Sequence, residues 1–224
     1  MVNPVGSYAT KYWYKTLIPL KEQMFLNQNQ KSLIIGSLLG DGTMRIGEGS
    51  KNANFKVEQG LMQKEYTFWK YQILKPLVLT EPKISFRYHA SGEKYQKSWW
   101  FRTVRHPILT DIYALFYEGE GYRNGRKIVP KSIQKYLDPL AIAVWIMDDG
   151  SFSKGSIDIS TYSFLEKEIK LLQKSIFNLY GIEVKYHPDR DKGFRMRFSV
   201  GETKKLIEII LPHVVPSLQY KLGA

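Results

Sequence analysis

The sequence predicts an α+β fold built from two pseudo-symmetric αββαββα repeats, with two apolar helices packed at the centre and the strands forming a saddle-shaped β-surface. Two observations lead to this prediction. The order helix, two strands, helix, two strands, helix occurs twice, in residues 31–118 and 139–224. The first helix of each repeat is apolar throughout and ends in the dipeptide Asp-Gly. The other residues form an N-terminal extension, 1–30, and a connector, 119–138.

In the first repeat, helical and strand periodicities follow one another in this order. The apolar helix is closed by Gly42, and the second helix stops at Pro76, which cannot continue it. The expected elements are helix 32–41, strands 43–48 and 52–59, helix 63–74, strands 83–89 and 97–104, and helix 107–117.

The second repeat shows the same order with shorter strands. Its apolar helix is closed by Gly150, and Gly181 caps a long amphipathic helix. The expected elements are helix 140–149, strands 151–152 and 156–160, helix 165–179, strands 182–187 and 194–200, and helix 202–211. The connector carries three glycines and five cationic residues, which favours a flexible basic linker.

The composition favours a folded protein that binds a polyanion. Lysine and arginine number 33 against 21 acidic residues, a formal charge of +12, so nucleic acid is the first partner to consider. A membrane surface is the second, but the basic residues are spread along the chain and the apolar runs are too short to cross a bilayer. The lack of cysteine excludes thiol nucleophiles and Cys-ligated zinc. We expect a soluble, intracellular protein.

The two apolar helices carry acid at an unfavourable place. Asp41 and Asp149 stand directly before the closing glycines, where the helix dipole disfavours negative charge unless a cation offsets it. Small residues such as Gly36 and Ala141 would let the helices approach closely and bring both carboxylates together. Each helix alone could simply be a buried helix with a glycine cap. Finding both at matching places favours a divalent-cation site, and oxygen ligands of this kind suit Mg²⁺.

The same segments carry a resemblance to a known family. Residues 34–42, IIGSLLGDG, and 142–150, IAVWIMDDG, resemble two copies of the motif that names the LAGLIDADG homing endonucleases. The second copy departs from the pattern at Val144, where the family has its first glycine, and it carries a second acid, Asp148. The resemblance covers the chain from about residue 31 onward. Within the family, the sequence is most similar to the single-chain subgroup encoded in yeast mitochondrial introns.

The resemblance implies a metal-dependent enzyme that cuts both strands of a long, asymmetric DNA target and leaves 3′ overhangs. It implies a monomer, with Mg²⁺ as cofactor, Mn²⁺ as its substitute and Ca²⁺ supporting binding without cleavage. Asp41 and Asp149 would be catalytic metal ligands. Gly40 and Asp148 are further candidates for the metal site, although a structural or supporting role is more expected for Asp148.

Three more residues are candidates through the resemblance. Lys127 in KIVP and Lys221 in QYKL match lysines that would each sit near one scissile phosphate, where a cation stabilises developing charge. The alternative for both is an ordinary solvated lysine. Gln59, at the end of a strand, resembles the polar residue that positions the attacking water in such enzymes.

Alternating strands in both repeats predict a basic surface. In strands 83–89 and 194–200, apolar residues would pack under helices while arginines face outward, where a β-ribbon can enter the major groove. The candidates for DNA contact are Arg45, Lys56, Arg87, Arg102, Lys185, Arg195 and Arg197. A solvated sheet face is the alternative. We expect packing in the core or against helices, and not stacking on bases, for Trp69, Trp99, Trp100 and Trp145, and the four histidines receive no catalytic role.

Three classes of function remain in competition. Metal-dependent hydrolysis of two phosphodiesters accounts for both acids. An intron maturase that binds its own intron RNA, or a non-cleaving DNA-binding regulator, would need only the positive surface. Binding to structural RNA is suggested by charge alone and leaves the paired acids unexplained.

Overall fold

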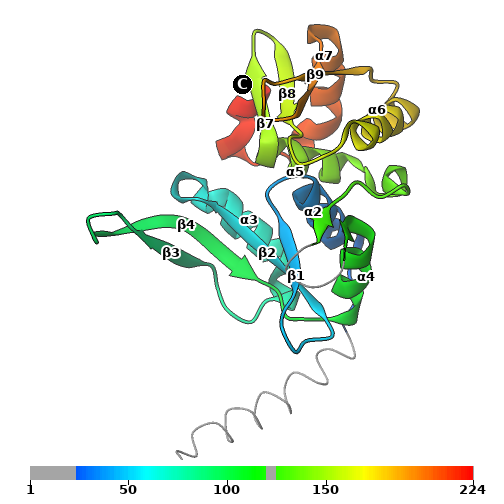
Figure 1. Ribbon diagram of the computed structural model, residues 1–224. Helices are drawn as coiled ribbons and strands as arrows, with labels where there is room; N and C mark the ends of the chain where they lie inside the picture. The colour runs from blue at the N-terminus through cyan, green and yellow to red at the C-terminus, as the bar shows by residue number, and fades with distance from the viewer. Residues whose placement is uncertain (1–23, 120–124, 224) are drawn as a thin grey trace, which may run out of the picture.

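The computed structural model describes residues 24–119 and 125–223, which form two copies of one αββαββα unit (Figure 1). The first contains α2 (Gln28–Leu39), β1 (Thr43–Ile46), β2 (Ala53–Gly60), α3 (Lys64–Leu74), β3 (Lys83–Tyr88), β4 (Lys94–Arg102) and α4 (Pro107–Phe116). The second contains α5 (Pro139–Asp149), β7 (Gly150–Ser153), β8 (Ser156–Ser160), α6 (Glu166–Tyr180), β9 (Val184–Pro188), β10 (Phe194–Phe198) and α7 (Val200–Ile210). The predicted fold is confirmed, with element ends displaced by at most four residues.

Shorter elements join these units. They are 3-10 turns η1 (Leu61–Gln63), η2 (Lys75–Leu77), η3 (Ile133–Tyr136), η4 (Leu211–His213) and η5 (Pro216–Leu222), and the paired strands β5 (Tyr117–Glu118) and β6 (Arg126–Lys127). Most of the extension 1–30 lies outside the described residues. Its last part opens α2 earlier than predicted, because Asn27 caps the helix and forms a reciprocal capping box with Gln30.

The two sheets share one strand order, β1-β2-β4-β3 in the first unit and β7-β8-β10-β9 in the second, and every pairing is antiparallel. Their registers also correspond. In the first sheet Thr43 pairs with Lys56, which pairs in turn with Arg102. In the second, Ser151, Asp158 and Arg197 form the same row. Each residue in one half can therefore be compared with a defined counterpart in the other.

Helices α2 and α5 pack side by side between the sheets (Figure 1). A Cβ built on Gly36 would lie 2.3 Å from the carbonyl oxygen of Ala141 and 2.8 Å from the Cβ of Val144. The predicted close approach is thus real, and the departure at Val144 is accommodated by the glycine opposite. Every residue from Ser32 to Leu39 in α2 and from Leu140 to Asp148 in α5 is buried, which accounts for the lack of a polar face in these segments.

The apolar face of each sheet is covered by helices of its own unit, α3 and α4 in the first and α6 and α7 in the second. Phe55, Val57 and Phe101 point into the first core, and Met196 and Phe198 into the second. The prediction for strand 194–200 is therefore confirmed.

The prediction for strand 83–89 is wrong in its outer half. Phe86 and Tyr88 are 47% and 68% exposed, because the β3–β4 hairpin runs outward beyond the end of α3 (Figure 1). The pairing also shifts register between Ser85 and Phe86, so that Lys97 is an extra residue on β4. The hairpin thus presents side chains on both of its faces.

The prediction of a flexible linker is also wrong for the part of the connector that the structure describes, 125–138. Val129, Ile133 and Leu137 are buried in the core. Arg126 forms ion pairs with Glu118 and Glu168, 2.6 and 2.9 Å long. This part of the connector is a packed element, and its basic residues are partly committed to internal contacts.

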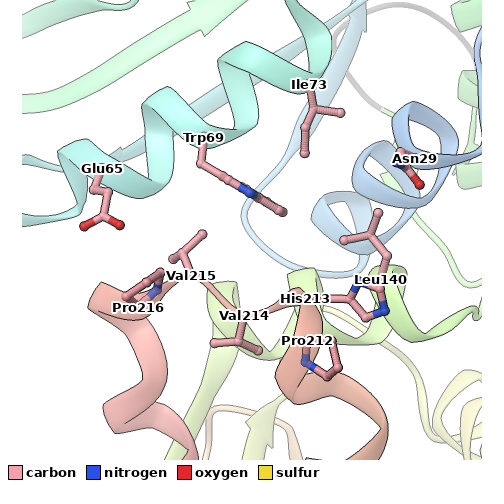
Figure 2. A pocket seen from close by; sticks show the side chains of 10 residues that line it. All are labelled: Asn29, Glu65, Trp69, Ile73, Leu140, Pro212, His213, Val214, Val215 and Pro216. Carbon is pink, nitrogen blue, oxygen red and sulfur yellow. The ribbon is translucent and has the colours of Figure 1, made fainter.

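A cleft of about 400 Å³ lies between α3, the N-terminal ends of α2 and α5, and the turn that follows α7 (Figure 2). Trp69 projects from α3 into this cleft, opposite Leu140 and Val215. Trp69 therefore lines a surface cleft and packs only partly against the core. Leu140 and Asp149 are separated by roughly 13 Å along α5, so the cleft is remote from the acids. Among the described residues, no helix combines the length and apolar character needed to cross a membrane.

Candidate active site

Two carboxylates meet where α2 and α5 end. Asp149 is the last residue of α5, and Asp41 follows the residue that caps α2. Burial, together with the nearby negative charges of Asp41 and Asp148, raises the pKa of Asp149 to about 7 against the opposing effect of Lys127 and Lys221. Both carboxylates also lie at the negative ends of helix dipoles. The arrangement concentrates negative charge that a divalent cation would offset.

The donor set fits a hard cation with few protein ligands. Among residues 24–119 and 125–223, no three side chains of His, Cys, Asp or Glu are grouped to hold a metal ion. The available donors are the two carboxylates and backbone carbonyls such as that of Gly40. Mg²⁺ keeps several waters and binds through one or two carboxylates plus substrate phosphates, so these residues suit it. A closed zinc or calcium cage would need more ligands.

One lysine lies at each helix end. Lys127 Nζ donates to the carbonyl oxygens of Gly40 and Gly42 at 2.8 and 3.0 Å. Lys221 Nζ donates to those of Met147 and Asp148 at 2.6 and 2.9 Å. Burial lowers the pKa of both lysines, while the surrounding carboxylates oppose that shift. The two lysines are therefore built into the site, and the alternative of an ordinary solvated side chain is wrong for both.

Asp148, the further candidate for the metal site, is engaged within the protein. Its carboxylate is buried and accepts hydrogen bonds from Lys70 at 2.7 and 3.0 Å, Tyr66 at 2.8 Å and Gln59 at 3.1 Å. Both oxygens are thus committed inside the protein. The supporting role that the sequence favoured for Asp148 agrees with this geometry.

Gln59 also lies behind the site. Its side chain is only 3% exposed, and its amide nitrogen donates to Asp148. This position is poor for orienting an attacking water, so the geometry favours a structural role over the one that the resemblance implied.

Sequence reasoning missed Lys70 and Tyr66, which complete the network around Asp148. A signal for them exists: Tyr66, Lys70 and Leu74 are spaced by four residues, so they share one face of α3. A lysine in the middle of an otherwise inward-facing stripe indicates a buried cation, which requires a buried acid as its partner.

Comparison with known proteins identifies the family. A profile of the LAGLIDADG DNA endonuclease family matches residues 31–206. The chain belongs to that family. It is 31% identical to the DNA endonuclease I-ChuI of Chlamydomonas applanata over 211 residues, covering 89% of this chain and 97% of that protein. It is 30% identical to the cytochrome b mRNA maturase bI2 of Saccharomyces cerevisiae, covering 88% of this chain and 48% of that protein.

Solved structures share the LAGLIDADG fold. The homing endonuclease I-WcaI bound to its DNA recognition sequence superposes with a TM-score of 0.82 at 20% identity, covering 99% of this chain and 94% of that chain. I-DmoI in complex with DNA and Mn superposes with a TM-score of 0.53 at 11% identity, covering 82% of this chain and 97% of that chain. At these identities the likeness establishes the fold.

The open face of the first LAGLIDADG sheet gathers three of the predicted DNA contacts. Arg45, Lys56 and Arg102 line a hollow of about 200 Å³. Trp100 lines the same hollow and lies with its ring centroid 5.5 Å from Lys56 Nζ. The expectation that Trp100 packs in the core or against a helix is therefore wrong, whereas its neighbour Trp99 packs edge-on against Phe68 on the helical side.

The second LAGLIDADG sheet brings three more predicted contacts together, and acids partly offset their charge, as Glu58 offsets that of Lys56 in the first sheet. Lys185 pairs across the strands with Arg197, whose guanidinium lies 3.7 Å from Asp158. Arg195 lies on the same face, 3.1 Å from Asp189. Arg87 stands apart from both groups, on the exposed β3–β4 hairpin.

Proposed function

We propose that the protein is a site-specific DNA homing endonuclease that cuts both strands of a long, asymmetric target and leaves 3′ overhangs. The observation that carries the proposal is the meeting of Asp41 and Asp149 at adjacent helix ends, each end holding one lysine on its backbone carbonyls. The resemblance to I-ChuI over nearly the whole of both chains supports it. Two carboxylate-lysine groups match a reaction carried out on two phosphodiesters.

Asp41 and Asp149 would hold Mg²⁺, or Mn²⁺ in its place. The bound cation would supply a Lewis acid for phosphodiester hydrolysis. The chain's own residues account for the rest. Lys127 and Lys221 are held on backbone carbonyls beside the acids, where each can offset the negative charge that develops on a phosphate in the transition state.

The sheets would supply recognition. Their open faces carry Arg45, Lys56 and Arg102 in one half and Lys185, Arg195 and Arg197 in the other. Arginine can read guanine through two hydrogen bonds in the major groove, and either cation can bind phosphate. Because both motif helices belong to one chain, the active species would be a monomer, and the two unlike halves would read an asymmetric sequence.

The test begins with selection of a target from a randomised DNA library, followed by plasmid cleavage. We expect linear product in Mg²⁺ or Mn²⁺, and binding without cleavage in Ca²⁺, which accepts carboxylates but holds them in looser geometry. Mapping both cut ends should show 3′ overhangs, and sedimentation should show one protein per target. Full cleavage in Ca²⁺, or a dimer as the only DNA-bound species, contradicts the proposal.

A maturase function is the second candidate, because the chain resembles a yeast mRNA maturase at 30% identity while spanning about half its length. The intron RNA that carries the coding sequence would then be a further partner. Splicing of that RNA with purified protein separates the two functions. If splicing is promoted and no DNA target can be selected, the maturase assignment replaces the endonuclease.

A further inference from the structure

Lys70 is a buried cation that contacts both motif helices. Its side chain has no exposed surface. Nζ lies 2.9 Å from Ser37 Oγ in α2 and 2.7 and 3.0 Å from the two carboxylate oxygens of Asp148 in α5. The ring of Tyr66 lies beneath it, with 4.4 Å between Nζ and the ring centroid. Lys70 therefore joins three helices from two repeats at one point.

Its partner Asp148 touches both ends that carry the acids. It directly precedes Asp149 in the chain, and its carbonyl accepts from Lys221. On its other side it packs against Gly40, where an added Cβ would lie 2.5 Å from the Cβ of Asp148. The amide nitrogen of Asp41 lies 3.4 Å from Oδ2 of Asp148. Moving the Asp148 side chain would therefore move the backbone near both carboxylates.

The other half has no such pair. Lys70 and Leu172 are both the seventh residue of their helices, which begin at Lys64 and Glu166. Leu172 is fully buried, so the equivalent position is filled by apolar packing.

The counterparts of the residues that Lys70 contacts carry no charge either. Counted from the closing glycines of the two motifs, Ser37 corresponds to Trp145, and Asp148 corresponds to Gly40. The fold therefore accepts uncharged residues at the positions equivalent to Lys70, Asp148 and Ser37. A buried ion pair often contributes no more stability than such packing, but it requires one geometry.

We infer that Lys70 is a positioning residue for the two carboxylates. By fixing Asp148 between Ser37 and Gly40, it holds the end of α5 against the end of α2 and sets the relative placement of Asp41 and Asp149. The inference rests on the proposed endonuclease function, since the placement matters for the cation that these acids would hold.

The experiment removes both charges together, because removing one would leave the other buried without a partner. The Lys70→Met/Asp148→Asn variant keeps the shapes of both side chains. Leu172→Met, at the equivalent position of the other half, is the matched control. For each protein we would measure the melting temperature, the Ca²⁺ concentration at half-maximal target binding by fluorescence anisotropy, and the single-turnover cleavage rate in Mg²⁺ at saturating protein.

For the double variant we expect binding at saturating Ca²⁺ close to that of the parent, a Ca²⁺ midpoint raised about fivefold, and cleavage slowed on the order of tenfold to a hundredfold, because small misplacements of reacting groups cost that much. Leu172→Met should match the parent in all three. A folded double variant with the parent's Ca²⁺ midpoint and rate overturns the role of Lys70. A parent that binds no selected target and does not cleave overturns the proposed function instead.

If the double variant fails to fold, Ser37→Ala decides. It removes the contact of Lys70 with α2 and leaves the ion pair in place, so it should raise the Ca²⁺ midpoint by about twofold to threefold, the smaller effect of losing one hydrogen bond. An unchanged midpoint and rate in Ser37→Ala would then overturn the inference.

Discussion

The two halves of the molecule share a backbone but differ in the chemistry of their open faces. At one row of the first sheet, Lys56 stands opposite Arg102, while the equivalent row of the second sheet has Asp158 opposite Arg197. In the next row on the same face, two residues along the strand, Trp100 in the first sheet corresponds to Arg195 in the second. Identical strand order has therefore been retained while nearly every outward side chain differs.

The helix ends, unlike the open faces, carry the same arrangement of lysine and aspartate in both halves. Lys127 and Lys221 each bind the carbonyl of the residue that precedes a motif aspartate, Gly40 in one half and Asp148 in the other. The proposed chemistry is thus duplicated, while the proposed recognition surface is not. This is what an enzyme needs if it performs one reaction twice on a target whose two halves have different sequences.

The strongest test of this symmetry is to remove one acid at a time. Asp41→Asn and Asp149→Asn should each reduce double-strand cleavage by about a thousandfold or more, because each loses a carboxylate that would hold the cation at a reacting phosphate. Binding at saturating Ca²⁺ should persist, since the acids would hold the cation and the sheets would contact the bases. Asp111→Asn, an exposed acid on α4, is the control and should leave both unchanged. If either active-site variant cuts both strands at the parent rate, the assignment is wrong.

Next in size is the effect of the lysines. Lys127→Met and Lys221→Met should each slow single-turnover cleavage on the order of a hundredfold with a smaller effect on affinity, because a cation beside the phosphate acts more strongly as charge develops. The duplicated geometry predicts similar losses for the two. If a variant cleaves as fast as the parent once it is fully bound, that lysine only binds a phosphate. Its proposed catalytic role would then be wrong.

The features that depend on local sequence patterns could be predicted from the sequence alone. Two helices that are apolar on all sides must be buried, and an aspartate before each closing glycine marks their ends. The common order of elements then gives the αββαββα repeat. Adjacent residues in a strand face opposite sides of the sheet, so Trp99 and Trp100 could not both have been in the core. Trp99 shares its face with the apolar Phe101, which would have placed Trp100 on the open face.

Features that depend on distant contacts could not be predicted. The pairing of Lys70 with Asp148 joins residues of different repeats, and no local pattern identifies the partner of a buried cation. The docking of residues 125–138 depends on pockets formed by the assembled core. The exposure of Phe86 depends on where α3 ends relative to the hairpin, which periodicity within the strand does not reveal.

The difference between the open faces can be tested through binding. Arg102→Ala should cost about 1–3 kcal/mol of target affinity if its contact is a bidentate one to guanine. Arg197→Ala, at the equivalent position, should cost less within that range, because Asp158 already offsets its charge. Competition binding in Ca²⁺ measures both. Asp158→Asn is the informative control, since it should raise affinity. Equal losses for the two arginines, with no effect of Asp158→Asn, would mean that the sheets bind alike.

The smallest expected effect concerns acid stability and the first sheet alone. Glu58 is partly buried, which would raise its pKa, but hydrogen bonds from Lys56, Ser98 and Lys97 outweigh this and lower the pKa to about 2. The pKa is thus lower in the folded protein than its ordinary value of 4.5, so the stabilisation is complete above pH 4.5 and is lost as the pH falls toward 2.

Glu58→Gln should therefore destabilise the protein at neutral pH by less than about 1 kcal/mol, the usual scale for a solvent-accessible ion pair, and the difference from the parent should vanish near pH 2. The equivalent position of the second sheet is Ser160, which does not titrate in this range, so the effect belongs to one half. Urea unfolding at a series of pH values measures it, with Glu65→Gln on α3 as the control. A destabilisation of Glu58→Gln that persists unchanged at low pH would show that the lost contact is packing, because only a titrating carboxylate makes the difference depend on pH.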